Sequence, residues 1–224
     1  MTTSNTVCAP IAATNSPPRT ITLAWTGASG LPYGVRLLEH LLAAGCQVHF
    51  ALTQAAQVVA RQEMDWTLPA QPQALKDALL ARCGHEYGER LHVYGLQDWF
   101  APPASGAGVS DAMVICPCTM GTLAAVAAGL AQNLIERAAD VCIKERRPLI
   151  LVPREAPLSV LHLENMLRLA RAGAVILPPM PAFYTHPQTI DDLLDFTVAR
   201  ILDHLGLAQN LLPAWPPAAQ TQET

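Results

Sequence analysis

The amino-acid sequence predicts an α/β fold, in which helices cover both faces of a parallel sheet. Short apolar runs, each suited to one buried strand, alternate along the chain with segments of helical periodicity. Turns rich in glycine and proline separate the two kinds of segment. Alternation of this kind produces a parallel sheet between two helical layers. The expected strands are residues 21–25, 47–52, 112–115, 149–152 and 175–177.

The expected helices lie between these strands and after the last of them. The first carries Leu37, Leu38, Leu41 and Leu42 on one side and stops at a glycine. Between residues 64 and 111 the periodicity weakens, and one helical run interrupts a proline-containing stretch. The remaining helices are expected at residues 53–63, 73–82, 123–128, 133–143, 159–172 and 189–205.

Residues 20–34 form the stretch around which the chain is organised. A strand leads into a tight turn at Gly27, Ser29 and Gly30, and a helix follows. This layout directs free N–H groups and a helix N-terminus at an anion. The spacing G-x-x-G-x-x-x-G matches neither a dinucleotide fingerprint nor a P-loop, and Thr53 stands where an NAD site favours an acidic residue. The stretch therefore predicts either a phosphate or mononucleotide site, or a plain glycine-rich turn.

Polar side chains also follow the other expected strands. In sheets of this type, ligands bind beyond the carboxyl ends of the strands. A second turn rich in small residues, Cys116–Thr122, follows the strand at 112–115. The residues expected at this edge are Ser29, Thr53, Thr119 to Thr122, Arg154, Glu155 and Tyr184.

Several charged and aromatic residues have an ordinary structural interpretation, and some of them also have a functional one. Arg154–Glu155 forms either an ordinary ion pair or a site whose buried carboxylate moves protons. Lys144–Arg147 has the pattern of a solvated helix end, with cations that complement the helix dipole. Trp99 is either a packed loop anchor or an aromatic wall for a cationic or allylic group. Arg137 and Arg200 lie in otherwise apolar helices, where a lone arginine usually extends to water.

The composition limits the class of protein. The chain has 224 residues, of which 51% are hydrophobic and 14% charged, which suggests that self-association covers part of its surface. A net charge of −4 argues against a nucleic-acid partner. We expect no membrane span and no secretory signal, because neither a long apolar run nor a basic start is present. The expected organisation is a disordered arm at 1–19, one domain at 20–207 and a proline-rich tail at 208–224.

The cysteines indicate a reduced, cytoplasmic protein. Cys46, Cys83 and Cys142 lie in apolar segments and are expected to be small core residues. Cys116 and Cys118 do not have the spacing of a zinc pair, and the sequence offers no second pair of ligands to complete a site. No metal site is therefore expected.

At the level of longer motifs, the sequence resembles the UbiX-like flavin prenyltransferases. The resemblance covers about residues 20–213, nearly the whole expected domain. The motifs that carry it are Thr26–Gly30, Ala101–Gly106, Cys116–Leu123, Asn133–Val141, Lys144–Leu149, Arg154–Leu158, His162–Met166 and Pro181–Tyr184.

The resemblance implies a three-layer Rossmann-like or flavodoxin-like flavoprotein that forms homo-oligomers, commonly dodecamers. It implies an enzyme that joins a dimethylallyl group from dimethylallyl monophosphate to N5 and C6 of reduced FMN, without a metal. The product, prenylated FMN, would serve UbiD-like decarboxylases, including those of ubiquinone synthesis. Two other classes stay open: an FMN-dependent cysteine decarboxylase of the same broad fold, and a non-catalytic FMN carrier.

The resemblance also assigns residues to roles. The expected FMN contacts are Gly27, Ala28, Ser29, Thr53, Thr119, Met120, Gly121, Thr122 and Arg154. The expected contacts to the allyl phosphate are Ser105, Gly106, Arg137, Lys144 and Glu155, joined by Tyr184 and Arg200 from a neighbouring subunit. Glu63 and Ser29 resemble the pair near N5, and Thr119 stands where many relatives have Ser.

Elementary chemistry agrees with these roles. Fixed cations and N–H donors stabilise the charge that develops on a leaving phosphate, which is the part expected of Lys144. The allyl fragment becomes cation-like, and Trp99 offers it a π face. Protons leave N5 and C6, and Glu155, Glu63 or the departing phosphate could accept them.

Overall fold

A computed structural model describes residues 19–212 and contains a six-stranded parallel sheet. The strand order β3-β2-β1-β4-β5-β6 is that of the Rossmann fold, so the predicted fold class is confirmed. The strands are β1 (Thr20–Trp25), β2 (Gln47–Leu52), β3 (Leu91–Val93), β4 (Ala112–Cys118), β5 (Leu149–Pro153) and β6 (Val175–Ile176).

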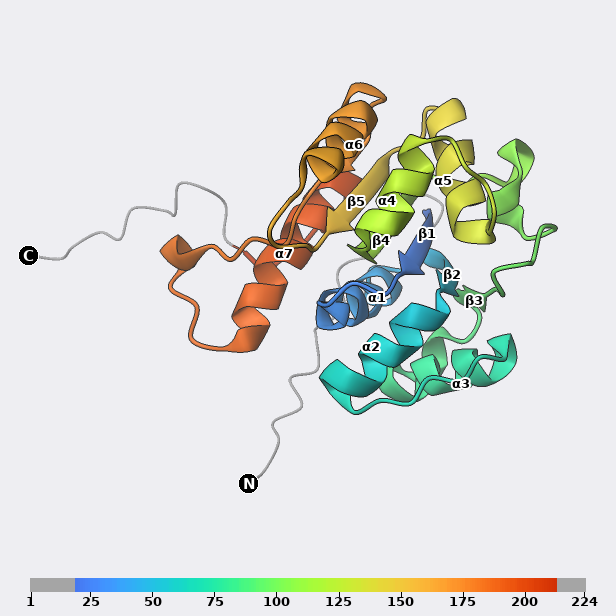
Figure 1. Ribbon diagram of the computed structural model, residues 1–224. Helices are drawn as coiled ribbons and strands as arrows, with labels where there is room; N and C mark the ends of the chain where they lie inside the picture. The colour runs from blue at the N-terminus through green and yellow to red at the C-terminus, as the bar shows by residue number, and fades with distance from the viewer. Residues whose placement is uncertain (1–18, 213–224) are drawn as a thin grey trace, which may run out of the picture. The chain divides into compact units, whose positions relative to one another are not determined.

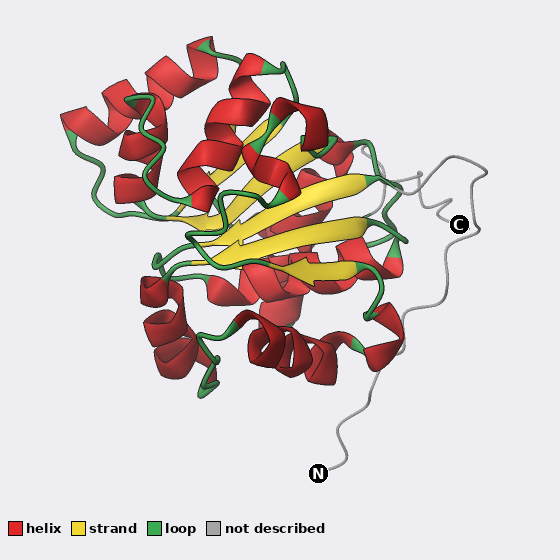
Figure 2. Ribbon diagram, turned by 90° about the vertical axis from the view of Figure 1, so that its right-hand side faces the viewer, coloured by secondary structure: helices red, strands yellow, loops and turns green. Residues whose placement is uncertain are grey.

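Helices lie on both sides of this sheet (Figures 1 and 2). The helices α1, α2 and α3 pack together on one face, and α4, α5 and α6 on the other. Side chains of Thr53, Thr119, Asn133 and Ser159 cap the first turns of α2, α4, α5 and α6. The helices are α1 (Leu31–Ala43), α2 (Gln54–Met64), α3 (Pro72–Cys83), α4 (Met120–Ala127), α5 (Leu134–Lys144) and α6 (Val160–Arg171).

Two segments differ from the sequence prediction. The short strand β3 was not expected, because its three residues include a histidine and are too few to show a period. The expected turn at Cys116–Thr122 is wrong in its first part, since β4 continues to Cys118 and is buried throughout. Helix α4 then begins at Met120, three residues earlier than expected, because Thr119 caps it.

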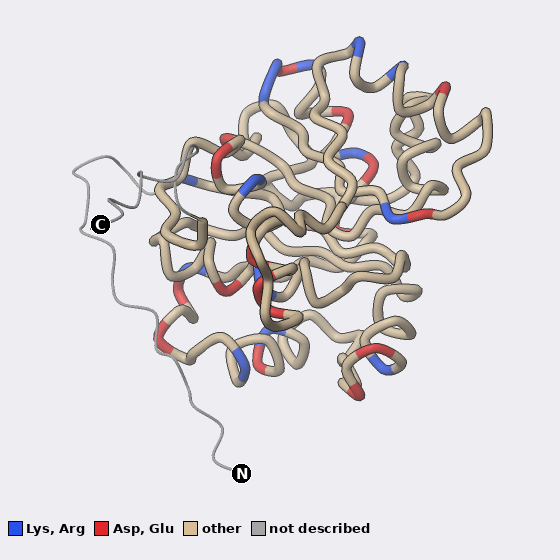
Figure 3. Tube along the Cα trace, turned by 90° about the vertical axis from the view of Figure 1, so that its left-hand side faces the viewer, with Lys and Arg blue, Asp and Glu red and all other residues tan. Residues whose placement is uncertain are grey.

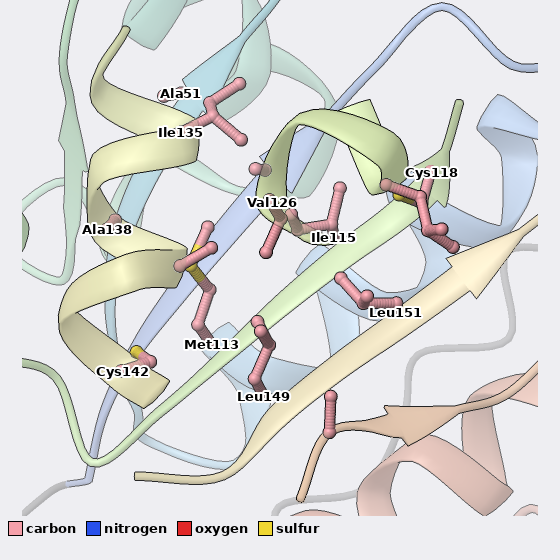
Figure 4. Packing of buried hydrophobic residues seen from close by; sticks show 14 of the residues in the cluster. Ala51, Met113, Ile115, Cys118, Val126, Ile135, Ala138, Cys142, Leu149 and Leu151 are labelled. Carbon is pink, nitrogen blue, oxygen red and sulfur yellow. The ribbon is translucent and has the colours of Figure 1, made fainter. Parts of the chain in front are cut away.

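On the face of the sheet that α5 covers, buried apolar side chains of the helix and of the strands form one cluster (Figure 4). Met113 and Ile115 of β4 and Leu151 of β5 are fully buried there, together with Ile135 and Cys142 of α5. Burial raises the pKa of the Cys142 thiol to about 12, so this thiol stays protonated and behaves as an apolar residue.

The other cysteines follow the same principle. Cys46, Cys116 and Cys118 are buried and Cys83 is half-buried, and all are free thiols. Burial raises the pKa of Cys118 to about 12. Within residues 19–212, no three His, Cys, Asp or Glu side chains gather into a possible metal site.

The chain divides into two compact units, residues 1–179 and 180–224. Within the second unit, the structure describes the short helix η4 (Phe183–Thr185) and the helix α7 (Ile190–Leu205). A capping box of Thr189 and Asp192 begins α7, and the N–H groups of Gln188 and Thr189 hold the pKa of the Asp192 carboxyl below its usual value. The arm expected at 1–19, apart from Arg19, and the tail from residue 213 lie outside the described residues.

Two global properties of the described chain bear on its partners. None of its helices is long and apolar enough to cross a membrane. Lys and Arg positions are interspersed with Asp and Glu positions along the chain (Figure 3).

A half-buried polar cluster lies in the first unit, around the middle of β2 and β3. His49 of β2 is in register with Thr22 of β1 and His92 of β3, and its Nδ1 lies 3.3 Å from Ser110 Oγ. The rings of His92 and Tyr94 both lie 5.6 Å from the His49 ring. Burial, and then the nearby His92, lower the pKa of His49 to about 4.

This pKa predicts a loss of stability in mild acid. Between about pH 6.5 and 4, His49 binds a proton in the unfolded chain and not in the folded one, so stability falls as the pH falls. His49→Gln should remove ~1–2 kcal/mol of that loss between pH 7 and pH 4.5, a range discounted for partial exposure. Denaturant unfolding at pH 7 and pH 4.5, at fixed protein concentration, measures it. The exposed His85→Gln is the control, and an equal pH dependence in His49→Gln and the unmodified chain would contradict the assignment.

Candidate functional site

The candidate site lies at the carboxyl edge of the sheet, where the strand order reverses. Chain connections from β1 and β4 leave in opposite directions along the sheet, and a crevice at such a switch point is where open α/β sheets bind ligands. The turns after β1, β2, β4 and β5 meet there, as predicted. They bring together Gly27 to Gly30, Thr53, Thr119 to Thr122, and Arg154.

The glycine turn after β1 packs tightly against the start of α2. A Cβ on Gly27 would collide with the side chain of Ala55, so only glycine fits there. Ala28 is buried, and Thr53 caps α2 by accepting a bond from Ala56 N–H at 3.2 Å. The N–H of Thr53 in turn donates to Trp25 O at 3.0 Å, which ties the second turn to the first strand.

Glu63 supplies the anion at the start of α1. Its carboxylate accepts bonds from the N–H of Gly30, at 3.0 and 3.1 Å, and of Leu31, at 3.0 Å. No side chain caps α1 from Gly30, so this carboxylate satisfies the donors that the helix leaves open. Glu63 thus contacts Gly30, the residue after Ser29, and the N-terminus of α1 already holds a negative charge.

The start of α4 is different, because part of it has no protein acceptor. Thr119 Oγ1 accepts a bond from Thr122 N–H at 3.1 Å and donates to Thr122 Oγ1 at 2.9 Å. Among the residues that the structure describes, none accepts a bond from the N–H of Met120 or Gly121. A Cβ on Gly121 would meet no atom within 4 Å. Two N–H donors at a positive helix end thus have no acceptor among the described residues, and one of them belongs to the exposed Gly121, an arrangement suited to a phosphate.

Arg154 links the turn after β5 to the glycine turn. Its Nε donates to the carbonyl oxygen of Ser29 at 3.3 Å, and its side chain is otherwise exposed. Glu155 is exposed as well, and its carboxylate accepts a bond from the N–H of Ala156 at 3.1 Å. Within residues 19–212 no ion pair joins Arg154 to Glu155, and the Glu155 carboxylate is not buried, so neither sequence interpretation describes this single chain.

A second set of predicted residues lies at the opposite edge of the sheet. Lys144 ends α5, and the chain then enters β5 at the amino edge, where Pro148 O accepts a bond from Met113 N–H at 2.9 Å. Lys144 pairs with Glu145, and this contact holds the pKa of the Glu145 carboxyl below its usual value. A Cβ on Gly106 would lie 2.9 Å from Lys144 Nζ, so the predicted Gly106 and Lys144 are neighbours.

Arg137 lies along α5 between the two edges. Its Nε donates to Ala104 O at 3.0 Å, and its Nη1 bonds Asp140 at 2.8 Å, which fixes the 101–106 motif, with Ser105, against the helix. The eleven residues of α5 span ~16 Å, so Lys144 lies about that far from the carboxyl edge. Within one chain, the structure does not bring Lys144 and Gly106 together with Arg154.

The remaining predicted residues are Trp99 in the first unit, and Tyr184 and Arg200 in the second. Trp99 is 41% exposed in the loop after β3, beside the fully exposed Phe100, so it is not a packed loop anchor. Tyr184 and Arg200 belong to the second unit, where the Tyr184 ring lies 6.0 Å from Phe196 and Arg200 pairs with Asp203 at 2.9 Å.

Sequence reasoning gave no role to three residues that shape these sets. Asp140 and Glu145 are the anionic partners of Arg137 and Lys144, and each lies within three positions of its partner, a spacing that could have shown them. Thr26 joins the turns after β1 and β4 through its buried hydroxyl, and nothing in a single sequence marks that contact.

Comparison with known proteins agrees with this geometry. The Flavoprotein family matches residues 11–202. Flavin prenyltransferase UbiX of Pseudomonas aeruginosa is 58% identical over 200 residues, covering 89% of this chain and 95% of that protein. The crystal structure of AnUbiX (PadA1) in complex with FMN and dimethylallyl pyrophosphate has a TM-score of 0.78 and 39% identity, over 89% of this chain and 98% of that one.

A further solved structure describes an assembly. The dodecameric FMN-dependent UbiX-like decarboxylase from Escherichia coli O157:H7 has a TM-score of 0.76 and 39% identity, over 88% of this chain and 98% of that one. On the breadth of these matches, this chain belongs to the Flavoprotein family and, within it, to the UbiX flavin prenyltransferases.

Proposed function

We propose that this chain joins the dimethylallyl group of dimethylallyl monophosphate to N5 and C6 of reduced FMN, giving prenylated FMN and inorganic phosphate. The observation that carries the proposal is the carboxyl-edge site, where N–H donors without an acceptor at α4 lie at the same edge of the sheet as the Glu63–Gly30 contact. This site occurs in a chain that is 58% identical to a flavin prenyltransferase. The proposal also includes a cytoplasmic location and delivery of the product to a UbiD-like decarboxylase.

The direct test is anaerobic incubation of the protein with reduced FMN and dimethylallyl monophosphate, followed by mass analysis of the released flavin. Added mass of one dimethylallyl unit supports the proposal. Unmodified FMN that stays bound indicates a carrier, and flavin-dependent loss of CO₂ from a cysteine-containing peptide indicates a decarboxylase.

In this proposal the carboxyl-edge residues hold FMN. The α1 N-terminus is occupied by Glu63, so the FMN phosphate binds at Met120 and Gly121, whose N–H groups have no acceptor among the described residues. Thr53, Thr119 and Thr122 supply hydroxyls, and Gly27 and Ala28 supply a close-packed backbone wall. Arg154 and Ser29, already in contact, line the same crevice. Reduced FMN supplies the two nucleophilic atoms when it is bound.

The residues that act on the donor come from more than one copy. Lys144 and Gly106, with Ser105 and Arg137 beside them, lie toward the opposite edge of the sheet from Arg154 in one chain, so we assign them to the site of a neighbouring copy. Tyr184 and Arg200 also serve a neighbour's site. The cations stabilise the phosphate as the C–O bond breaks, Trp99 faces the allyl group, and Glu155 or Glu63 accepts protons from the flavin.

A second copy has an apolar surface on which to dock. Helix α6 begins five residues after Glu155, and its Val160, Leu161, Leu163 and Leu167 side chains are 50–69% exposed. Clusters of this kind on soluble proteins mark interaction surfaces. A copy seated on α6 would stand beside the carboxyl-edge site, and exposed Glu155 would attract Lys144 of that copy.

A charge placed at Gly121 tests the phosphate site. Gly121→Asp fits sterically, because the position is open, and its carboxylate should stabilise the free α4 N-terminus while repelling a phosphate. We expect FMN affinity to fall at least ~10-fold with riboflavin affinity unchanged, measured by flavin fluorescence titration. Gly121→Asn is the uncharged control. Equal losses for FMN and riboflavin would place the phosphate elsewhere.

Replacement of Lys144 separates a phosphate ligand from a solvated helix end. Loss of a preorganised charge on the leaving group should lower single-turnover prenylation ~100- to 1,000-fold, whereas loss of a solvated charge changes stability by ~0.5 kcal/mol at most and leaves turnover alone. Lys144→Ala should still bind FMN with its usual affinity. Arg146→Ala, at the same exposed segment, is the matched control. Unchanged prenylation by Lys144→Ala would exclude the assignment.

Mixed oligomers test whether the site is shared. Lys144→Ala and Arg154→Ala subunits carrying different affinity tags are co-expressed, and doubly tagged assemblies are purified. Part of the activity should return, because some interfaces pair an intact Lys144 with an intact Arg154. Assemblies in which every subunit carries Lys144→Ala should stay inactive. Failure of the mixture to regain activity, or an active monomer in light scattering, would contradict shared sites.

A further inference from the structure

We propose that Thr26 is a positioning residue that sets the geometry of the flavin site by holding the first turn of α4. This inference rests on the proposed function, since it assigns a purpose to a contact behind the FMN-binding residues. The Thr26 side chain is fully buried and does not face the crevice's open space, so its effect must pass through Thr119.

Thr26 stands where β1 leaves the sheet. Its N–H donates to Pro117 O at 3.2 Å, which continues the β1–β4 pairing beyond its last registered pair, Ala24 with Ile115. In a parallel ladder, the carbonyl of that same residue would accept the next N–H of the neighbouring strand, that of Thr119. The Thr26 hydroxyl does so instead, accepting from Thr119 N–H at 2.7 Å, and it donates its own proton to Pro117 O at 2.9 Å.

The hydroxyl therefore replaces a backbone carbonyl at the end of the ladder. Because the hydroxyl accepts this bond, the Thr26 carbonyl does not have to face β4, and the backbone can enter the turn at Gly27. Strand β4 remains bonded to Thr26 through the Thr119 N–H. Thr119 is also the cap of α4, and its φ and ψ of −70° and 150° direct its side chain at Thr122. The orientation of the free Met120 and Gly121 N–H groups follows from that cap.

One substitution removes this contact with little other change. Thr26→Val keeps the shape of the side chain and the Thr26 N–H bond to Pro117, but leaves the part-buried Thr119 N–H without its acceptor. A buried donor without a partner favours a shift of the turn that holds it. Thr26→Ser restores the hydroxyl and should restore the site.

The chain offers a matched control on the same strand. Thr22 is also buried in β1, and its hydroxyl bonds Ser110 Oγ at 2.8 Å, remote from the carboxyl edge. Thr22→Val therefore removes a comparable buried hydroxyl without touching the α4 turn. Any general effect of losing a polar group from β1 appears in both valine variants.

The experiment compares FMN dissociation constants of the assembled protein by fluorescence titration, beside its denaturant midpoint. We expect Thr26→Val to weaken FMN binding at least ~10-fold, and Thr22→Val and Thr26→Ser to change it less than ~3-fold. Hydrogen exchange of the 116–123 segment in the FMN-free protein should accelerate in Thr26→Val alone. If Thr26→Val fails to fold, Thr26→Ala and Thr26→Ser give the same contrast.

Two results would overturn the inference: unchanged FMN affinity in Thr26→Val, or equal weakening by Thr22→Val and Thr26→Val. Neither depends on turnover. An unmodified protein that binds FMN but transfers no prenyl group would refute the proposed activity and leave the role of Thr26 intact.

Discussion

The parallel pairing of β1 with β4 is the contact on which the rest of the structure depends. Residues 21–24 of β1 pair with residues 112–115 of β4, and both strands are buried along these lengths. Because chain connections leave this pair in opposite directions, the turns after the two strands diverge and open the crevice at their carboxyl ends. The glycine turn, the α4 cap and the Arg154 contact with Ser29 all take their positions from it.

The two helices that start at this crevice solve the same problem in different ways. Each leaves backbone N–H donors without partners in its first turn. At α1, Glu63 from the end of α2 accepts two of them, whereas at α4 a hydroxyl accepts one and two remain free among the described residues. The sequence suggests an anion site at the glycine turn, before α1. In the structure Glu63 occupies that helix end, and the N–H groups without an acceptor are those at the start of α4.

Most of the fold was accessible from the sequence because its elements are marked locally. Apolar runs bounded by turns identified β1, β2 and β5, and caps such as Ser159 and Thr189 lie where the pattern placed the helix starts. The resemblance to a known family supplied the site residues, and the structure joins those at the carboxyl edge. Three features could not be predicted, because each depends on contacts between residues far apart in the sequence. They are the short β3, the Thr26 contact with Thr119, and the separation of Lys144 from Arg154.

The carboxylate of Glu63 at α1 has a consequence for the protein before any ligand arrives. An anion-binding loop commonly stays loose until its anion orders it, and the ordering then subtracts from the binding free energy. Here the chain supplies its own anion, so the glycine turn and the first turn of α1 are held in place by an internal contact that spans 33 positions of sequence. The wall of the crevice is thus built in advance, and a ligand meets a surface that has already lost its conformational entropy.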